Sequence, residues 1–226
     1  MKMANSKKAL IFDSGAIITL ALNDLLFILE PLKKAFGGDF LISQSVKNEI
    51  VDVPLKTRRF ALEALMIKAL VEKGILSVVS SPELRKETSR VLESANSAYL
   101  ADNERMRIIH EGEASCIALF NMISSEKKAI VIDERTTRML CEAPENLHRL
   151  YEKKLHRKIG FAEKNAAVFK DVRIIRTAEL CLIAYRKGIV SLSASPSESI
   201  RAMLYAVKFK GCSISINEIE IARRIA

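Results

Sequence analysis

Motifs for binding zinc or nucleotides are missing from this sequence of 226 residues. Its four cysteines and three histidines show no CxxC, HxxxH or HExxH spacing, which leaves a zinc hydrolase poorly supported. We expect buried free thiols, with a disulfide or a zinc site as the weaker alternative; the cysteines are Cys116, Cys141, Cys181 and Cys212. No GxGxxG or GxxxxGK(S/T) loop follows an apolar run, so a nucleotide-binding α/β domain is disfavoured.

Long apolar runs are also missing, since none reaches the ~18 residues that span a bilayer. The N-terminus is basic but has no small-residue cleavage site, and Asp13 interrupts the apolar stretch behind it, which argues against a signal peptide. We therefore expect a cytoplasmic protein without a membrane partner. No repeat, low-complexity tract or linker divides the chain, so a single domain over residues 1–226 is expected.

The composition supports a sizeable core and a polyanionic partner. Hydrophobic residues make up 49% of the chain, and 36 Lys and Arg against 27 Asp and Glu give a net charge of +9. A basic balance of this size favours nucleic acid as the partner, although it also serves solubility alone.

Five short apolar runs have the pattern of buried strands, and helical spacing recurs between them. These runs are residues 9–12, 39–43, 75–79, 128–132 and 171–175. The alternation predicts an α/β fold, three layers deep, with a central parallel sheet of about five strands.

The helical pattern between the strands makes specific predictions. Residues 14–36 read as helical with a break near Pro31, and residues 83–106 as one long polar helix. The segment 57–73 is helical with a buried side of Phe60, Leu62, Leu65, Met66, Ala69 and Leu70. Three more helices are expected near the end of the chain, at 177–187, 197–209 and 215–225.

Four acids are placed where a site would form. Asp13 and Asp133 each follow a buried strand, whereas Glu49 and Glu113 lie in the first turns of helices. If the first and fourth strands are neighbours, the chain reverses direction between them and leaves a crevice at that point. Carboxylates gathered there would repel one another unless a cation such as Mg²⁺ or Mn²⁺ lay among them. The alternative is local: Asp13 caps a helix, and Glu113 complements a helix dipole.

The acids stand in motifs that resemble those of the PIN domain nucleases. The motifs occur in the family's order over roughly residues 8–220: Ile11-Phe12-Asp13-Ser14-Gly15, Val46-Lys47-Asn48-Glu49-Ile50, Gly112-Glu113-Ala114 through Ile117-Ala118-Leu119, Ile132-Asp133-Glu134-Arg135, and Arg176-Thr177 before Lys187-Gly188. Each motif is weak alone, and the ordered set is fairly specific.

The resemblance implies an Mg²⁺- or Mn²⁺-dependent endoribonuclease similar to VapC-type toxins. Asp13, Glu49, Glu113 and Asp133 would be its catalytic and metal-binding acids. Ser14 and Thr177 would orient carboxylates or water, a role that Glu134 would share unless it is only a solvent-side neighbour. The implied partners are RNA, an antitoxin protein and a second copy of the chain. The alternative is a PIN-like module that binds RNA or protein without cleaving.

Two segments depart from the family's usual lengths: residues 141–172 are longer than the family usually allows, and the helix predicted at 83–106 is extended. Residues 143–176 carry nine Lys and Arg against four acids, and their core, 143–171, reads as a basic insertion; residues 190–226 read as a C-terminal helical extension. The insertion would contact phosphates, and Tyr151 or Phe161 would stack on a base. Its predicted RNA contacts are Lys153, Lys154, Arg157 and Lys158. The alternative for the same residues is a solvated helix face.

Overall fold

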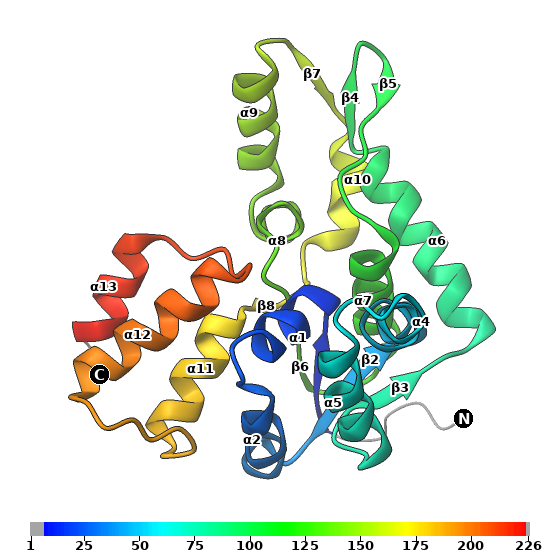
Figure 1. Cartoon of the computed structure of the whole chain (residues 1–226). Coiled ribbons are helices and arrows are strands. Elements are labelled where there is room, and N and C mark those ends of the chain that lie inside the picture. Colours follow the sequence, from blue (N-terminus) through cyan, green and yellow to red (C-terminus); the bar gives the residue numbers. More distant parts are fainter. Residues whose placement is uncertain (1–6, 225–226) are drawn as a thin grey trace.

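Five parallel strands form the central sheet of this computed structural model, which describes residues 7–224. The sheet order is β3-β2-β1-β6-β8 (Figure 1). The strands are β1 (Lys8–Phe12), β2 (Asp39–Ser43), β3 (Ser77–Val79), β6 (Lys127–Val131) and β8 (Ile174–Ile175). The predicted α/β fold is confirmed, and each of the five predicted strands forms, although β3 and β8 are shorter than expected. Residues 1–6 and 225–226, which the predicted domain and last helix include, lie outside the described part.

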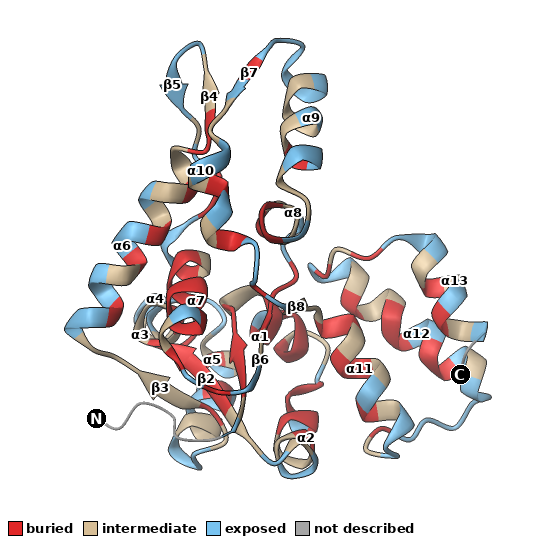
Figure 2. Ribbon diagram, turned by 180° about the vertical axis from the view of Figure 1, so that it is seen from behind, coloured by how far each residue is buried: buried red, intermediate tan, exposed pale blue. Residues whose placement is uncertain are grey.

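Helices cover both faces of the sheet and make it the middle of three layers. One face carries α1 (Ser14–Ala21), α2 (Leu29–Phe36) and α5 (Ala61–Glu72), and the other carries α6 (Pro82–Asn96) and α7 (Glu111–Met122). Figure 2 shows the buried residues concentrated in the strands and in the helix faces against them. Ala9, Ile11 and Phe12 of the central strand are fully buried. A strand covered on both faces needs a continuous apolar run, which β1 has.

The chain reverses direction between β1 and β6, as expected if these strands are neighbours. β1 pairs with β2 on one side and with β6 on the other, and the Asp13 amide extends the second pairing by donating to the Val131 carbonyl (3.0 Å). The carboxyl ends of the two strands therefore flank the predicted crevice.

The predicted helix 14–36 is broken earlier than expected. The first part of this segment, α1, ends at Ala21. A 3-10 turn, η1 (Leu26–Ile28), then precedes α2. The break lies at residues 22–25, where Asp24 has a φ of 54°, and Pro31 sits in the first turn of α2. A proline costs little there because the first amides of a helix have no partner within the helix.

The predicted helix 83–106 is wrong over its last ten residues. α6 ends at Asn96, and the chain then forms a hairpin of β4 (Tyr99–Ala101) and β5 (Glu104–Arg105). The two residues between the strands, Asp102 and Asn103, have φ of 50° and 67°. A turn with positive φ at both central residues matches the twist of a hairpin, and Asp and Asn tolerate it better than most residues.

The hairpin belongs to a second small sheet, and the basic insertion contributes the third strand of that sheet. β7 (Ile159–Phe161) pairs with β4, and the helices α9 (Pro144–Leu155) and α10 (Glu163–Ala166) with the 3-10 turn η3 (Ala167–Phe169) accompany it. We call this unit, residues 97–107 and 143–171, the upper lobe; it projects at the top of Figure 1. Two segments that are far apart in the sequence thus fold together.

Aromatic packing holds the upper lobe together. The Tyr99 ring stacks on Phe161 (5.3 Å between centroids) and meets the edge of Tyr151 (6.0 Å), while its hydroxyl donates to the Pro144 carbonyl (3.0 Å). Phe161 also stacks on His148 (5.3 Å). The prediction that Tyr151 or Phe161 stacks on a base is therefore not supported, because both rings already pack inside the lobe.

The predicted buried side of α5 is largely exposed. α3 (Gln44–Lys47), a π-helical turn η2 (Asn48–Asp52) and α4 (Val53–Thr57) lead to it. Phe60, Leu62, Leu65 and Met66, which we call the α5 apolar face, are 40–69% exposed. The smaller Ala64 and the side chain of Ile67 pack inward instead. The helix is apolar on more than one side, so the periodicity alone did not select the side that the core covers.

Three helices form the C-terminal part, close to their predicted bounds. They are α11 (Thr177–Arg186), α12 (Pro196–Phe209) and α13 (Ile216–Arg224), which lie together beside the sheet (Figure 1). The Arg176 guanidinium joins them by pairing with Glu179 and with Glu218 (2.7 Å). The four cysteines are buried free thiols, as predicted. Within residues 7–224, no single helix is long and apolar enough to cross a membrane.

Candidate active site

Asp13 is buried at the carboxyl end of β1, and only one of its carboxylate oxygens has a partner. Its Oδ2 accepts a hydrogen bond from the Gly15 amide (3.1 Å), so Asp13 does cap α1, as the local interpretation expects. Its Oδ1 has no hydrogen-bond partner within the described residues, and the residue is 4% exposed. A buried carboxylate oxygen without a donor is costly, which a helix cap alone does not explain.

The pKa of Asp13 shows which of the predicted acids lie close to it. Its pKa is raised from the ordinary value of 3.8 to about 7, chiefly by burial and then by the negative charges of Glu113 and Glu49, against the lowering effect of the Gly15 amide. A neighbouring carboxylate acts in this direction because it disfavours a second negative charge. The fold thus brings Asp13, Glu49 and Glu113 together from three separate elements.

Glu49 reaches the site from the π-helical turn η2. Desolvation raises the pKa of its carboxyl, a hydrogen bond from Ser14 lowers it, and the charges of Glu113 and Glu111 raise it. A π-turn inserted between helical segments is rare and is frequent at functional sites. The sequence predicted an ordinary helix here, so the turn that carries Glu49 was missed.

The Glu49 carboxylate lies against the backbone of Gly112. A Cβ built on Gly112 would lie 3.0 Å from Oε1 and 3.2 Å from Oε2 of Glu49. Any larger residue would therefore press on the carboxylate, so glycine permits this close approach.

Glu113 also serves two purposes. It lies in the first turn of α7, and its Oε2 accepts a hydrogen bond from the His110 amide (2.9 Å), which completes the local role expected of it. Its charge also raises the pKa of Asp13. The same side chain therefore accepts the bond at the start of its own helix and lies close enough to Asp13 to affect its charge.

Asp133 lies just beyond the end of β6, the strand next to β1. Its Oδ1 accepts a hydrogen bond from the Thr177 amide (2.8 Å), whereas its Oδ2 is buried without a partner in the described chain. Its charge helps to raise the pKa of the Cys181 and Cys212 thiols. The charges that raise the pKa of Asp13 and Glu49 are those of Glu113, Glu49 and Glu111. The structure groups three of the four predicted acids and places the fourth beside them.

The carboxylates do not stand in a finished metal-ligand arrangement. Among residues 7–224, no group of three or more His, Cys, Asp or Glu is placed to hold a metal ion. The chemistry of the donors still suits a hard cation, because carboxylate oxygens are the ligands that Mg²⁺ and Mn²⁺ prefer. The two orphaned oxygens, Asp13 Oδ1 and Asp133 Oδ2, are the atoms that such an ion would satisfy.

Two of the three predicted orienting residues contact the acids. Ser14 donates to Glu49, and the backbone amide of Thr177, rather than its hydroxyl, holds Asp133. Glu134 instead caps α8 (Arg135–Glu142), accepting from the Thr137 amide (2.6 Å) and hydroxyl (3.0 Å). The carboxylate of Glu134 is thus engaged in capping the helix that follows it.

Two charged neighbours of Glu49 were missed from the sequence. Glu111 raises and His110 lowers the pKa of the Glu49 carboxyl. Both residues directly precede Gly112-Glu113 in the sequence. The charged residues of the run His110-Glu111-Gly112-Glu113 could therefore have been included among the predicted site residues.

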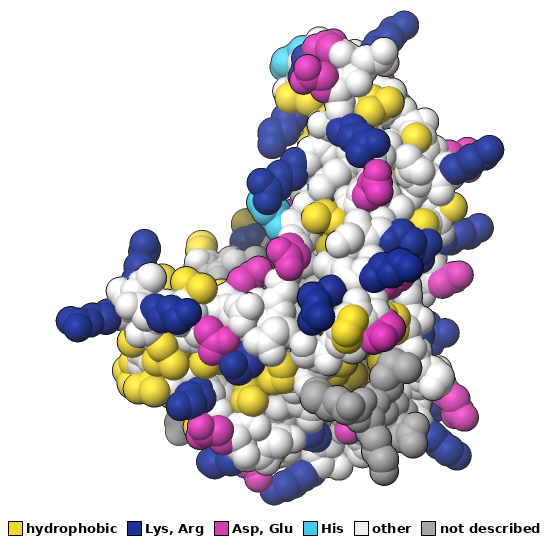
Figure 3. All heavy atoms as spheres, turned by 90° about the vertical axis from the view of Figure 1, so that its right-hand side faces the viewer, with side chains coloured by type: hydrophobic (Ala, Val, Ile, Leu, Met, Phe, Trp, Pro, Cys, Tyr) yellow, Lys and Arg dark blue, Asp and Glu magenta, His cyan; other side chains and the backbone are white. Residues whose placement is uncertain are grey.

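The predicted RNA contacts lie in the upper lobe. α8 connects this lobe to the carboxyl end of β6. Lys153, Lys154 and Lys158 are exposed and make no hydrogen bond or ion pair within the described part of the chain. Arg157 pairs with Asp102 in the hairpin turn and therefore ties two parts of the lobe together. Figure 3 shows Lys and Arg side chains mixed with acids over the face that carries α6, without a patch of one sign.

Comparison of the chain with family models, with curated proteins and with solved structures finds no match. The resemblance to PIN domain nucleases therefore rests on the sequence motifs, and the fold and the acid cluster stand on the structure.

The raised pKa of Asp13 predicts how the metal-free protein responds to pH. The folded chain holds this proton more tightly than the unfolded chain, so the stabilisation is present below pH ~4 and is lost as the pH rises through about 7. From a pKa change of this size we expect a loss of about 2–3 kcal/mol in unfolding free energy between pH 5 and pH 8.

The measurement is urea unfolding in EDTA across that range. Asp13→Asn removes the titrating group and should flatten the dependence, whereas Asp171→Asn, at an exposed acid, should leave it intact. Equal slopes for the wild type and Asp13→Asn would contradict the assignment.

Proposed function

We propose that this protein is an endoribonuclease that hydrolyses RNA phosphodiester bonds with the help of Mg²⁺ or Mn²⁺. The observation that carries the proposal is the buried, unpaired Oδ1 of Asp13 beside the charges of Glu49 and Glu113, at the point where the sheet reverses its strand order. Ligand sites in open α/β sheets form at that point. The motifs that resemble PIN domain nucleases support the same activity.

The four acids are the proposed cation ligands. A divalent cation supplies positive charge for the phosphoryl and leaving oxygens and makes water a better nucleophile. Asp13 and Asp133 would offer their unpaired oxygens, and Glu49 and Glu113 would complete the set directly or through water. Ser14 and the Thr177 amide hold two of these carboxylates in place.

The alternative is a module that binds RNA or protein without cleaving it. The acids argue against this alternative, since a pure RNA binder gains nothing from three carboxylates at the place where phosphates must lie. Their mutual repulsion and burial cost folding free energy that a cation would recover.

Cleavage of a structured and an unstructured RNA, with and without Mn²⁺, tests the activity. We expect cleavage that EDTA abolishes, and a loss of at least about 100-fold in rate for Asp13→Asn and for Glu113→Gln, because each removes a charge from the cation site. Manganese binding, followed by calorimetry, should weaken in the same two variants.

The matched control is Glu126→Gln, which removes an exposed acid outside the upper lobe, just before β6, and should cleave at the wild-type rate. Cleavage that persists in EDTA, or Mn²⁺ binding that Asp13→Asn leaves unchanged, would contradict the proposed site.

RNA is the proposed substrate partly because of the charge of the upper lobe. Its free lysines, Lys153, Lys154 and Lys158, lie in and after α9, in the segment with a net excess of Lys and Arg. Lysines on a surface bind phosphates of any sequence and release counterions as they do so.

A triple change of these lysines to Gln should therefore reduce the salt dependence of RNA binding. For a single strand we expect the slope of log K against log salt to fall by about 2, since each phosphate contact contributes about 0.7. The control changes three exposed lysines outside the lobe, Lys73, Lys187 and Lys210, and should leave the slope unchanged. Equal slopes in the two triple variants would show that the lobe does not contact RNA.

A second copy of the chain is the proposed partner of the α5 apolar face, with an antitoxin protein as the alternative occupant. Leu62 is 69%, Leu65 is 53% and Met66 is 40% exposed, and their spacing places them on one side of the helix, with the exposed Phe60 just before it. Large apolar side chains gathered on one exposed surface typify protein interfaces. The sequence pattern predicts a buried side here, so this exposure was not expected.

Sedimentation of the purified chain tests this partner. We expect a particle of twice the chain mass of 25.3 kDa, and a single chain after Leu62→Glu with Leu65→Glu, because charges on the face oppose its burial. Ile216→Glu, at an exposed apolar residue of α13, should leave the dimer intact. A wild-type protein that stays monomeric at all concentrations would rule out the second copy.

A further inference from the structure

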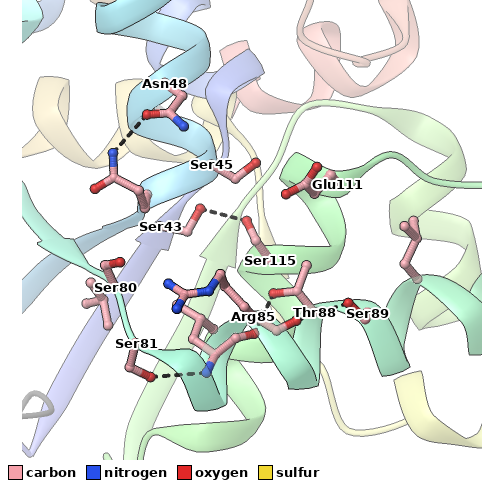
Figure 4. A pocket seen from close by; sticks show the side chains of 14 residues that line it. Ser43, Ser45, Asn48, Ser80, Ser81, Arg85, Thr88, Ser89, Glu111 and Ser115 are labelled. Carbon is pink, nitrogen blue, oxygen red and sulfur yellow. Dashed lines mark hydrogen bonds between the residues drawn. The ribbon is translucent and has the colours of Figure 1, made fainter.

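A cavity of about 400 Å³ opens between the end of β2, α6 and α7, and the proposed chemistry does not use it. Its walls come from the end of β2, from α3, from the start of α6 with the loop before it, and from α7 (Figure 4). Its volume lies in the range of roughly 300–1,000 Å³ that is usual for sites of small molecules and cofactors. Six of its lining residues are serines.

Some of these hydroxyls are already engaged by the fold. Ser43 and Ser115 hydrogen-bond to each other (2.6 Å), and Ser115 also donates to the Gly112 carbonyl (2.6 Å). Ser81 caps α6, and Thr88 donates to the Leu84 carbonyl. These bonds fix one wall of the cavity and leave it rigid.

Four polar side chains around the cavity have no such bond: Ser45, Ser80, Arg85 and the acid Glu111. They come from four different segments, and none of them makes a side-chain hydrogen bond or ion pair within residues 7–224. The charge of Arg85 lowers the pKa of Glu83 on its own helix. Figure 4 shows the Arg85 side chain directed from α6 toward β2 and β3. One cation and two hydroxyls around a cavity can bind a ligand with a phosphate and hydrogen-bonding edges.

The cavity shares two elements with the proposed active site. Its lining residues Ser45 and Asn48 lie just before Glu49 in the chain, and Glu111 lies just before Gly112 and Glu113. The segments that carry two of the proposed acids therefore also form walls of the cavity. The substrate rather than a remote effector is the natural occupant of a cavity at that position.

We propose that this cavity holds one nucleotide of a single-stranded RNA, with Arg85 on its phosphate and the hydroxyls of Ser45 and Ser80 on its base or ribose. The inference rests on the proposed ribonuclease function and adds where the strand lies beside the acids. Hydroxyls that both donate and accept suit the 2′-hydroxyl of RNA and the edges of an unpaired base. The site would therefore select unpaired RNA, whereas the lysines of the upper lobe would bind phosphates without selection.

Binding of a fluorescein-labelled, ten-nucleotide unstructured RNA to the full-length protein tests this inference. The measurement is made in EDTA by fluorescence anisotropy, so that it reports binding without cleavage. Arg85→Gln is compared with Lys86→Gln, since both residues are exposed on α6 and both changes remove one positive charge, but Lys86 lines a separate hollow. We expect Arg85→Gln to bind about tenfold more weakly, as the loss of one charged hydrogen bond predicts.

Lys86→Gln should stay within about twofold of the wild type, because surface charge alone contributes little. A second variant, Ser45→Ala with Ser80→Ala, should lower the preference for this RNA over the DNA of the same sequence. Equal binding by the Arg85 and Lys86 variants, or an unchanged RNA preference in the double variant, would overturn the assignment. Thermal unfolding confirms that the variants are folded.

The two proposals fail in different ways. If the cavity is assigned wrongly, RNA binding is indifferent to Arg85 while Mn²⁺-dependent cleavage remains sensitive to Asp13. If the nuclease function is wrong, no cleavage occurs at any Mn²⁺ concentration, whereas the EDTA binding measurement still separates Arg85→Gln from Lys86→Gln.

Discussion

The cost of burying the Asp13 carboxylate is the constraint on which the site depends. The strand that carries it must be buried on both faces to hold the sheet together, so the residue at its end is drawn out of water. The helix cap satisfies one oxygen and leaves the other without a donor. Glu49 and Glu113 then add negative charge at the same place. A fold retains such an arrangement at a cost to stability, which is typical of functional sites rather than of structural ones.

The neighbouring elements are shaped by the same requirement. A π-helical turn carries Glu49 toward Asp13, and Gly112 leaves room for its carboxylate. The site and the serine-lined cavity share these elements, since α3 and η2 supply one wall and the start of α7 the other. The acids and the proposed nucleotide site are therefore carried by the same segments, and the upper lobe follows β6 in the chain through α8.

Sequence patterns identified what is local. The five strands were recognisable because a strand segment buried on both faces must be apolar, as in residues 9–12 and 129–131. The capping roles of Asp13 and Glu113 follow from positions at helix starts, and the C-terminal helices from regular periodicity with glycine behind α11. The hairpin after α6 was missed because its strands are two and three residues long and follow a strong helical pattern.

By itself, then, the sequence determined the strand and helix segments and the four acids that end or begin them. Only the tertiary structure decided that β1 and β6 are neighbours, that Asp13, Glu49 and Glu113 meet, and that the apolar face of α5 is left uncovered. The physical reason is that periodicity records which residues avoid water, whereas strand order and side-chain direction depend on packing between segments distant in the chain. The orphaned oxygens and the open cavity are products of that packing.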